Sequence, residues 1–261
     1  MASPHILLTN DDGIDSPGFR ALYETLTEFA EVTAVAPAAD QSAVGRAMSN
    51  EVAVVEHDLG YAIEGTPADC TVVGLESLCP DVDMVVSGIN KGANLGAYVL
   101  GRSGTVSAAV EAAFFEVPAI AVSLYVPIRG GDWRDQANDV SDYREATRAA
   151  TYLVKHARGA GVFEQAEYLN VNAPIAGDGP APMEITTPST MYDMTADRNG
   201  EKITLTDRVW ERMRDDDIPD PDGTDRRALV EGRVSVSPLT APHTTEHHET
   251  LDALAETFNN P

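Results

Sequence analysis

Short apolar runs alternate with helix-like segments through the first half of the 261-residue chain. His5–Thr9 predicts a buried strand, and Pro17–Phe29 carries apolar residues at helical spacing after Ser16, a residue type that favours a helix N-terminus. Further strand-like runs are Glu31–Pro37, Glu51–Glu56, Tyr61–Glu64, Val82–Ser87 and Pro118–Leu124, and further helix-like segments are Thr66–Leu78 and Gly104–Glu116. This alternation predicts an α/β fold, with a mostly parallel sheet and helices on both faces.

The second half of the chain is less regular and contains no internal repeat. Asp142–Gly161 predicts a helix and Tyr168–Asn172 a strand. Three later runs predict antiparallel strands that extend partly from the core: Met183–Thr187, Ile203–Val209 and Ala228–Val236. His248–Phe258 predicts a C-terminal helix. The length suits one large domain with an appended segment.

The chain is strongly acidic, with 42 Asp and Glu residues against 18 Lys and Arg and a formal net charge of -24. Such a surface repels phosphate backbones, so we do not expect general binding to nucleic acid. Lysine occurs only at Lys91, Lys155 and Lys202. An acidic, lysine-poor surface is typical of salt-adapted, halophilic proteins, because concentrated salt screens the self-repulsion. The alternative is an acidic protein of an ordinary mesophile.

No apolar run approaches the roughly 18 residues that a membrane-spanning helix needs, and Met1–Leu8 lacks the features of a secretory signal. We therefore expect a cytoplasmic protein without a membrane partner. Cys70 and Cys79 match no metal-binding spacing, so we expect them to be reduced, mostly buried thiols.

Polar side chains follow three of the predicted strands. Asp11 and Asp12 come after the first strand, Ser42 lies beyond the second, and Asn90 follows Val82–Ser87. Ligands of open parallel sheets bind outside the carboxyl ends of the strands, so these side chains can converge on one crevice. Their oxygens are the hard ligands that Mg²⁺ or Mn²⁺ prefers, whereas zinc is not indicated. The alternative is an Asx turn in which the Asp side chains cap backbone N–H groups.

A second set of residues is suited to binding phosphate. Gly88–Gly96 is predicted as a glycine-rich loop that carries Asn94. Ser103, Gly104 and Thr105 then open a helix, whose free N–H groups and positive dipole end favour an anion. Ordinary N-capping is the alternative for this Ser-Gly-Thr. Beside a metal crevice, a phosphate site is the better interpretation, and the two together indicate metal-assisted phosphoryl hydrolysis.

Other nucleotide and hydrolase motifs are absent. The sequence has no dinucleotide-binding fingerprint, no P-loop and no nucleophile elbow. A receiver domain of a response regulator also carries acidic residues after its first strand, but its phospho-accepting Asp and its late Lys are not evident here. A metal- and nucleotide-binding regulatory module without significant turnover remains open as the alternative to an enzyme.

Several of these motifs, taken together, resemble the stationary-phase survival protein SurE family. They are Ile6–Gly18 (ILLTNDDGIDSPG), Val35–Ser42 (VAPAADQS), Gly65–Cys70 (GTPADC), Val85–Gly96 (VVSGINKGANLG) and Ser103–Val106 (SGTV). The resemblance implies a metal-dependent phosphatase of nucleoside monophosphates, a 5′-nucleotidase, with possible activity on 3′-nucleotides and short polyphosphate. It also implies a Rossmann-like core, about residues 1–190 of a single domain. A β-hairpin and C-terminal segment, about residues 191–261, would exchange between subunits of a homodimer or homotetramer.

The resemblance also assigns roles to individual residues. It implies one divalent ion per subunit, Mg²⁺ or Mn²⁺, with ligands at Asp11, Asp12, Ser42 and Asn90, and catalytic roles for Asp11 and Asp12. The implied phosphate contacts are Asn94, Ser103, Gly104 and Thr105. The chain departs from the family at Ala38–Ala39–Asp40, where Asp-Arg-Asn is usual, and at Arg102, where tyrosine is frequent. These departures bear on substrate preference rather than on the metal ligands.

Overall fold

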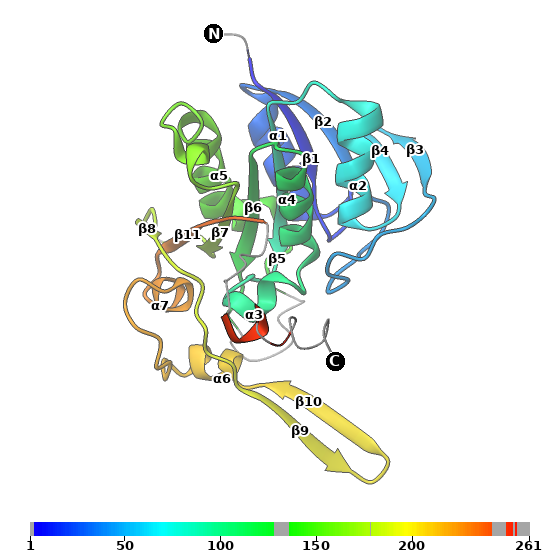
Figure 1. The fold of residues 1–261 in the computed structure, drawn as a ribbon. Coiled ribbons are helices and arrows are strands. Elements are labelled where there is room, and N and C mark those ends of the chain that lie inside the picture. The colour runs from blue at the N-terminus through cyan, green and yellow to red at the C-terminus, as the bar shows by residue number, and fades with distance from the viewer. Residues whose placement is uncertain (1–2, 128–135, 178, 242–248, 253, 255–261) are drawn as a thin grey trace.

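A nine-stranded sheet forms the centre of the computed structural model, which describes residues 3–127, 136–177, 179–241, 249–252 and 254 (Figure 1). Its strands lie in the order β3-β4-β2-β1-β5-β6-β7-β11-β8. Their bounds are β1 His5–Thr9, β2 Glu31–Pro37, β3 Ala53–His57, β4 Gly60–Glu64, β5 Met84–Lys91, β6 Ala119–Tyr125, β7 Tyr168–Pro174, β8 Met183–Ile185 and β11 Val234–Leu239. Neighbours from β4 to β7 are parallel, and β3 and β11 run antiparallel to β4 and β7. The predicted α/β class is confirmed.

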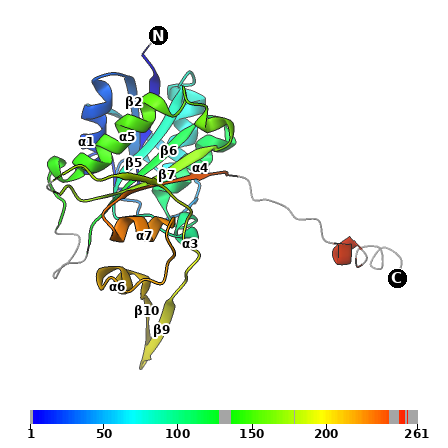
Figure 2. The same ribbon diagram turned by 90° about the vertical axis from the view of Figure 1, so that its left-hand side faces the viewer.

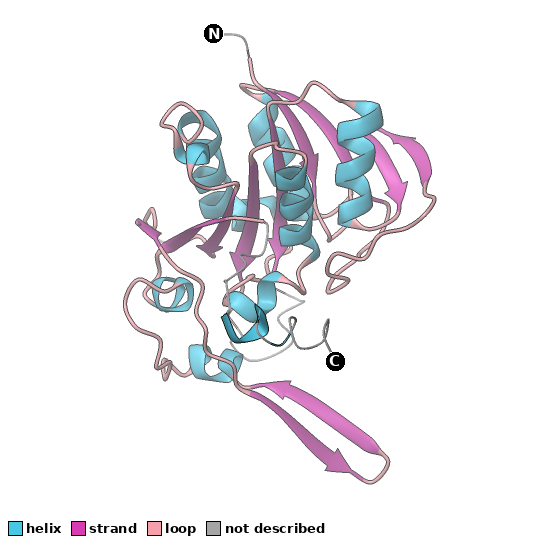
Figure 3. Cartoon of the chain, in the orientation of Figure 1, coloured by secondary structure: helices cyan, strands magenta, loops and turns pink. Residues whose placement is uncertain are grey.

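Helices cover both faces of this sheet (Figure 3). On one face α1 (Pro17–Thr27) and α5 (Arg144–His156) enclose a core with Leu8, Phe19 and Val122. On the other face α2 (Pro67–Val73) and α4 (Gly104–Phe114) enclose a second core. The central strands are buried on both sides, which explains why their sequences are continuous apolar runs without a polar face.

The order of the strands places a topological switch between β1 and β5. From β1 the chain passes through α1 to β2 on one side, whereas β5 lies on the other side of β1. In open α/β sheets such a switch leaves a crevice at the carboxyl ends of the two strands. Asp11 and Asp12 directly follow β1, and Asn90 lies near the end of β5, so the predicted site residues flank this crevice.

A hairpin projects from the body of the molecule, on the side where the parallel strands end (Figure 2). It consists of β9 (Met194–Asn199) and β10 (Lys202–Asp207), which pair only with each other among the described residues. Two short helices, α6 (Val209–Arg214) and α7 (Asp225–Val230), lie between this hairpin and the sheet. They share a third cluster of buried residues, which are Leu95, Val209, Met213, Ile218 and Leu229.

Several predictions for the second half of the chain were wrong in detail. Ala228–Val236 is not one strand, because its first residues belong to α7 and only Val234 onward pairs with β7. Met183–Ile185 pairs parallel to β11 rather than antiparallel. In the first half, the predicted loop Gly88–Gly96 begins inside β5, which continues to Lys91 with a register shift between Ser87 and Asn90.

Three short helices, α3, α6 and α7, were not predicted, and one predicted helix is described only in part. The helix α3 (Ala97–Leu100) lies within the segment that joins β5 to α4, and α6 follows β10. Residues 249–252 and 254 of the expected C-terminal helix are helical, and its other residues lie outside the described part of the chain.

Candidate active site at the strand ends

A cavity of about 600 Å³ opens where the parallel strands end. Five of the eight predicted site residues line it, although they come from four separate segments of the sequence. They are Asp11, Ser42, Asn90, Asn94 and Ser103. The other three, Asp12, Gly104 and Thr105, contact residues that line the same cavity. The structure therefore brings the two predicted sets, for metal and for phosphate, to one place.

Asp11 is a buried carboxylate, with 3% of the residue exposed. The Thr105 hydroxyl at the start of α4 donates a hydrogen bond to Asp11 Oδ1. Gly104 fits against the same side chain, since a Cβ atom at this position would lie 2.8 Å from Asp11 Cβ. Burial raises the pKa of Asp11 to about 6, although the hydrogen bonds from Thr105 act in the opposite direction. In the part of the chain that the structure describes, hydrogen bonds and not a positive side chain offset the burial of Asp11.

Asp12 lies beside Asp11, and its Oδ2 accepts a hydrogen bond of 2.7 Å from the backbone N–H of Lys91. This contact ties the loop after β1 to the end of β5. Burial, together with the negative charge of Asp11, raises the pKa of Asp12 to about 7. Two neighbouring carboxylates whose ionisation is disfavoured in this way form a site that a cation stabilises.

Ser42 is exposed and is held by Asp40 in the turn after β2. The backbone N–H of Ser42 donates to Asp40 Oδ1 at 2.8 Å, and its hydroxyl donates to the same oxygen at 2.5 Å. The Asp40 charge also raises the pKa values of Asp11 and Asp12. Asp40 is therefore a third acidic residue of the site. In the sequence, Asp40 stands out only as part of a departure from the family motif.

The two asparagines of the site have different surroundings. Asn90 donates from Nδ2 to the Gly92 carbonyl oxygen at 2.5 Å, which leaves its side-chain oxygen as the candidate ligand. Asn94 is more deeply fixed, because its Nδ2 donates to Ser123 Oγ at 2.9 Å. Its backbone N–H donates to Asn172 Oδ1 at 2.7 Å. Asn94 thus anchors the loop between β5 and α3 to the sheet, in addition to lining the cavity.

The N-terminus of α4 meets the same cavity through Ser103. The Ser103 hydroxyl oxygen accepts the backbone N–H of Val106 at 3.1 Å, so it caps the helix and still has its own proton to donate. An eleven-residue helix that begins here directs its positive dipole end and free N–H groups toward the strand ends. Lys91 and Arg102 add positive side chains to the cavity lining. This combination is suited to an anion.

The donor set fits a hard divalent cation. Among the described residues no three His, Cys, Asp or Glu side chains are placed to hold a metal, so two carboxylates would need hydroxyl and amide oxygens to complete the site. The predicted set supplies these donors, since it combines Asp11, Asp12, Ser42 and Asn90. Buried, mutually destabilising carboxylates with oxygen neighbours suit Mg²⁺ or Mn²⁺ and do not suit zinc.

Part of the cavity lining was not predicted from the sequence. It comes from β10 and α6, and it consists of Leu205, Thr206, Asp207, Trp210, Glu211 and Arg214. Val209 and Met213, four residues apart, mark the buried side of α6. That spacing, together with the rare residue type at Trp210, is the signal that could have indicated this wall.

The fold and this site define an α/β protein of Rossmann-like topology, whose ligand site lies at the topological switch of its sheet. The family model described as "Survival protein SurE" matches residues 6–195. The chain therefore belongs to the SurE family, as its motifs indicated.

Two archaeal relatives and one solved structure illustrate this similarity. A protein of Haloquadratum walsbyi named 5'-nucleotidase SurE is 66% identical over 256 residues, which cover 97% of this chain and 96% of that protein. A protein of the same name from Haloarcula marismortui is 65% identical over 259 residues, covering 99% and 96%. The crystal structure of the SurE protein from Aquifex aeolicus has a TM-score of 0.77 at 28% identity, covering 98% of this chain and all of that chain.

Proposed function

We propose that this protein is a metal-dependent 5′-nucleotidase, which hydrolyses nucleoside monophosphates to nucleoside and phosphate. The observation that carries the proposal is the meeting of Asp11 with the N-terminus of α4 in one cavity. A carboxylate pair for a cation and a helix N-terminus for an anion are the two parts that metal-assisted phosphoryl hydrolysis needs. The relatives named 5'-nucleotidase SurE support the same activity.

In the proposed reaction the phosphate group binds at the start of α4. The Ser103 hydroxyl and the free N–H groups of the helix donate to its oxygens, and they stabilise the negative charge that develops during transfer. Asp11, Asp12, Ser42 and Asn90 hold the divalent ion. When bound, that ion supplies positive charge beside the phosphoryl group and favours deprotonation of water.

Asp11 or Asp12 orients the attacking water and accepts its proton as general base. Without the ion, burial raises the pKa values of both carboxyls toward neutrality, and a bound ion would favour their ionised, proton-accepting forms. The water oxygen bonds to phosphorus, the bond from phosphorus to the ribose 5′-oxygen breaks, and the proton that the carboxylate accepted passes to that oxygen, which leaves as a hydroxyl group. Lys91 and Arg102 contribute positive charge toward the dianionic substrate.

We further propose that the hairpin takes part in forming a homodimer or homotetramer, as the family resemblance implies. The hairpin exposes Ile203 (61%) and Leu205 (69%), and an isolated two-stranded hairpin is only marginally stable in water. Burial of these side chains against another subunit would stabilise it. Sedimentation velocity of the wild type and of an Ile203→Ser variant tests this proposal, since the variant should shift toward monomer.

The activity itself is tested by phosphate release from AMP with Mn²⁺ or Mg²⁺, and with EDTA as the control. Metal-dependent turnover supports the proposal. Tight binding of AMP without phosphate release would instead indicate the regulatory module that the sequence left open. The same assay with a nucleoside 3′-monophosphate and with short polyphosphate tests the wider substrate range that the resemblance implies.

No described helix is long and apolar enough to cross a membrane.

A further inference from the structure

The cavity is larger than a phosphate group and a metal ion require. Its volume of about 600 Å³ lies within the range of about 300–1,000 Å³ that small-molecule sites occupy. The residues proposed to hold the metal and the phosphate come from the strand ends and α4. Six further lining residues come from β10 and α6, which lie beyond the strand ends in both views (Figures 1 and 2).

The lining from β10 and α6 has a different chemistry from the phosphate end. Trp210 supplies a large aromatic surface, and Val99, Tyr125 and Val126 add apolar and aromatic surface from other elements. The charged residues of α6 in the lining are Glu211 and Arg214, and Asp207 lies at the end of β10. This surface combines an indole with two carboxylates and one guanidinium, so its net negative charge is unsuited to a second phosphate.

Trp210 is fixed in place by its neighbours in α6. Val209 and Met213 are buried, with 1% and 4% of each residue exposed, and they anchor the helix in the third core cluster. Trp210 is itself half-buried, and it packs against the same cluster while it lines the cavity. One part of its side chain is therefore supported by the core and another part faces the ligand space. An aromatic ring held in this way loses little conformational freedom when a ligand binds.

Resting on the proposed 5′-nucleotidase function, we propose that Trp210 forms the nucleobase subsite and stacks on the planar, uncharged base of the substrate. Glu211 and Arg214 lie on the same helix and can accept from, or donate to, polar groups at the edge of that base. Trp210 is then a specificity-determining residue, which makes the enzyme prefer nucleotides to sugar phosphates that lack a base.

The test compares AMP with ribose 5-phosphate, which has the same reacting group and no base. Base stacking on an aromatic side chain contributes about 1–3 kcal/mol, so we expect Trp210→Leu to lower kcat/KM for AMP by about 10-fold or more. The same variant should hydrolyse ribose 5-phosphate within about 2-fold of the wild type. Trp210→Phe is the matched control, because it keeps an aromatic face, and it should retain most of the preference for AMP.

A binding measurement separates this inference from the proposed reaction. The chain has two tryptophans, so a Trp133→Phe background leaves Trp210 as the only indole reporter. Addition of AMP in the presence of Mg²⁺ should quench its fluorescence, whereas ribose 5-phosphate should not. If the wild type hydrolyses neither substrate, the proposed function fails, and AMP-dependent quenching still supports the base subsite.

Two results would overturn the inference. One is a folded Trp210→Leu variant, as judged by its circular-dichroism melt, that loses equal activity toward AMP and ribose 5-phosphate or loses none. The other is a fluorescence signal that does not respond to AMP in a protein that hydrolyses it. If Trp210→Leu does not fold, the quenching experiment decides the question, because it keeps the indole ring in place.

Discussion

At the scale of single residues, the site depends on two neighbouring carboxylates that the fold keeps from solvent. Burial raises the pKa of Asp11 to about 6, and burial with the charge of Asp11 raises the pKa of Asp12 to about 7. The fold therefore places two charges where they are costly without a cation. Buried carboxyls with strongly raised pKa values are typical of functional sites, because such a pair lowers the stability of the fold unless a ligand compensates for it.

The first prediction concerns Asp11→Asn. The variant keeps a side chain of the same shape but removes one anionic oxygen, so it should weaken metal binding and the positioning of water together. We expect phosphatase activity to fall at least about 100-fold. That is the smallest loss expected from removing a general base, and the loss of a metal ligand adds to it. The melting temperature in EDTA should stay equal or rise, because a buried charge has been removed. Near-wild-type turnover with saturating metal would contradict the role of Asp11.

The second prediction concerns pH and the stability of the metal-free protein. Unfolded Asp has a pKa near 3.9, so between about pH 4 and 7 the folded state binds more protons than the unfolded state. The free energy of unfolding should therefore decrease as pH rises through this window, by several kcal/mol. Urea unfolding in EDTA and concentrated KCl at several pH values measures it.

An Asp11→Asn, Asp12→Asn double variant is the control for this pH effect. It lacks both titrating groups, so its free energy of unfolding should change less with pH than that of the wild type. Saturating Mg²⁺ should also remove much of the wild-type decrease, because the cation stabilises the ionised carboxylates. Equal pH dependence in the wild type and the double variant would show that other groups cause it.

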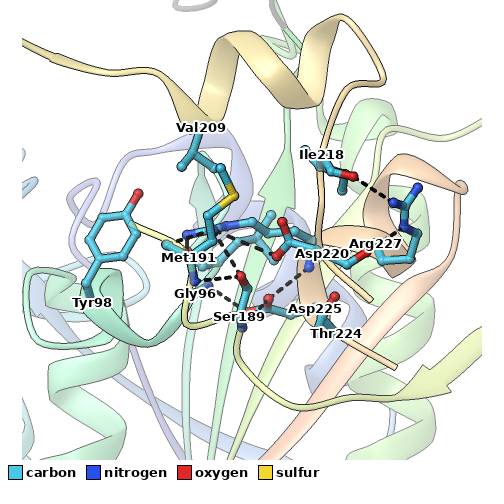
Figure 4. Close-up of polar contacts among 12 residues, drawn as sticks. Gly96, Tyr98, Ser189, Met191, Val209, Ile218, Asp220, Thr224, Asp225 and Arg227 are labelled. Atoms are coloured by element: carbon cyan, nitrogen blue, oxygen red, sulfur yellow. Dashed lines mark hydrogen bonds and ion pairs between the residues drawn. The ribbon is translucent and has the colours of Figure 1, made fainter. Parts of the chain in front are cut away.

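At the scale of elements, a buried charge cluster joins the helix α7 to the segment that leads to the phosphate site (Figure 4). The Asp225 carboxylate accepts backbone N–H groups of Gly96 at 2.6 Å and Ser189 at 2.9 Å. Arg226, with 1% exposed, donates to Ser189 Oγ at 3.1 Å. Its guanidinium also lies 5.3 Å from the ring centroid of Tyr98. The cluster thus fixes the chain just before α3 and α4.

Tyr98 extends this connection to the cavity. Arg102, which lines the cavity, lies 5.2 Å from the same ring centroid, and the Tyr98 hydroxyl donates to Asp207 Oδ2 at the end of β10. Arg102, which stands where tyrosine is frequent in the family, is therefore held by its contact with the ring of Tyr98. Tyr98 thus links the phosphate end of the cavity to the lining that β10 supplies.

The third prediction tests this cluster through Gly96. Gly96 has a φ of +84°, and a Cβ atom there would lie 2.1 Å from Arg226 Nη2. Gly96→Ala should therefore destabilise the protein by about 1–3 kcal/mol and lower its melting temperature. Gly101→Ala is the matched control, because φ is -76° there and no atom lies within 4 Å of the added carbon. Equal melting temperatures for the two variants would show that the cluster does not constrain Gly96.

The sequence predicted the elements that carry their own signal. The strands of the first half are continuous apolar runs, and α1 and α4 begin at recognisable N-terminal residues, so their existence and order were predicted correctly. The side chains at the strand ends were also brought together as predicted, because parallel strands end at one edge.

The elements that were missed depend on tertiary contacts. The helices α3, α6 and α7 have four to six residues, too few to be stable alone, and α6 and α7 are stabilised by burying residues such as Met213 and Leu229. The burial of Arg226 was not predicted from the sequence. A buried arginine needs partners for its charge, and only the folded chain brings those partners together. The cavity lining from β10 and α6, which includes Trp210, was missed for the same reason.

At the scale of the whole molecule, a net charge of -24 surrounds a core of ordinary apolar composition. Several arginines form ion pairs, such as Arg158 with Asp83 and Arg212 with Asp193, but acidic residues greatly outnumber basic ones. The folded state therefore carries self-repulsion that depends on the surrounding salt. The relatives from Haloquadratum walsbyi and Haloarcula marismortui agree with a halophilic protein.

The last prediction is that stability and activity rise together with salt. The Debye length is about 30 Å at 0.01 M and about 3 Å at 1 M, so dilute buffer lets repulsion act across the molecule and molar KCl confines it. Activity should not be lost at high salt, because the divalent ion and the N-terminus of α4 would act on the phosphate at contact distance, where screening is weak. Circular-dichroism melts and AMP hydrolysis across KCl concentration measure both, with sucrose as a non-ionic stabiliser for comparison. A melting temperature that responds to sucrose but stays flat in KCl, with the highest activity below about 0.1 M, would identify an acidic enzyme without salt adaptation.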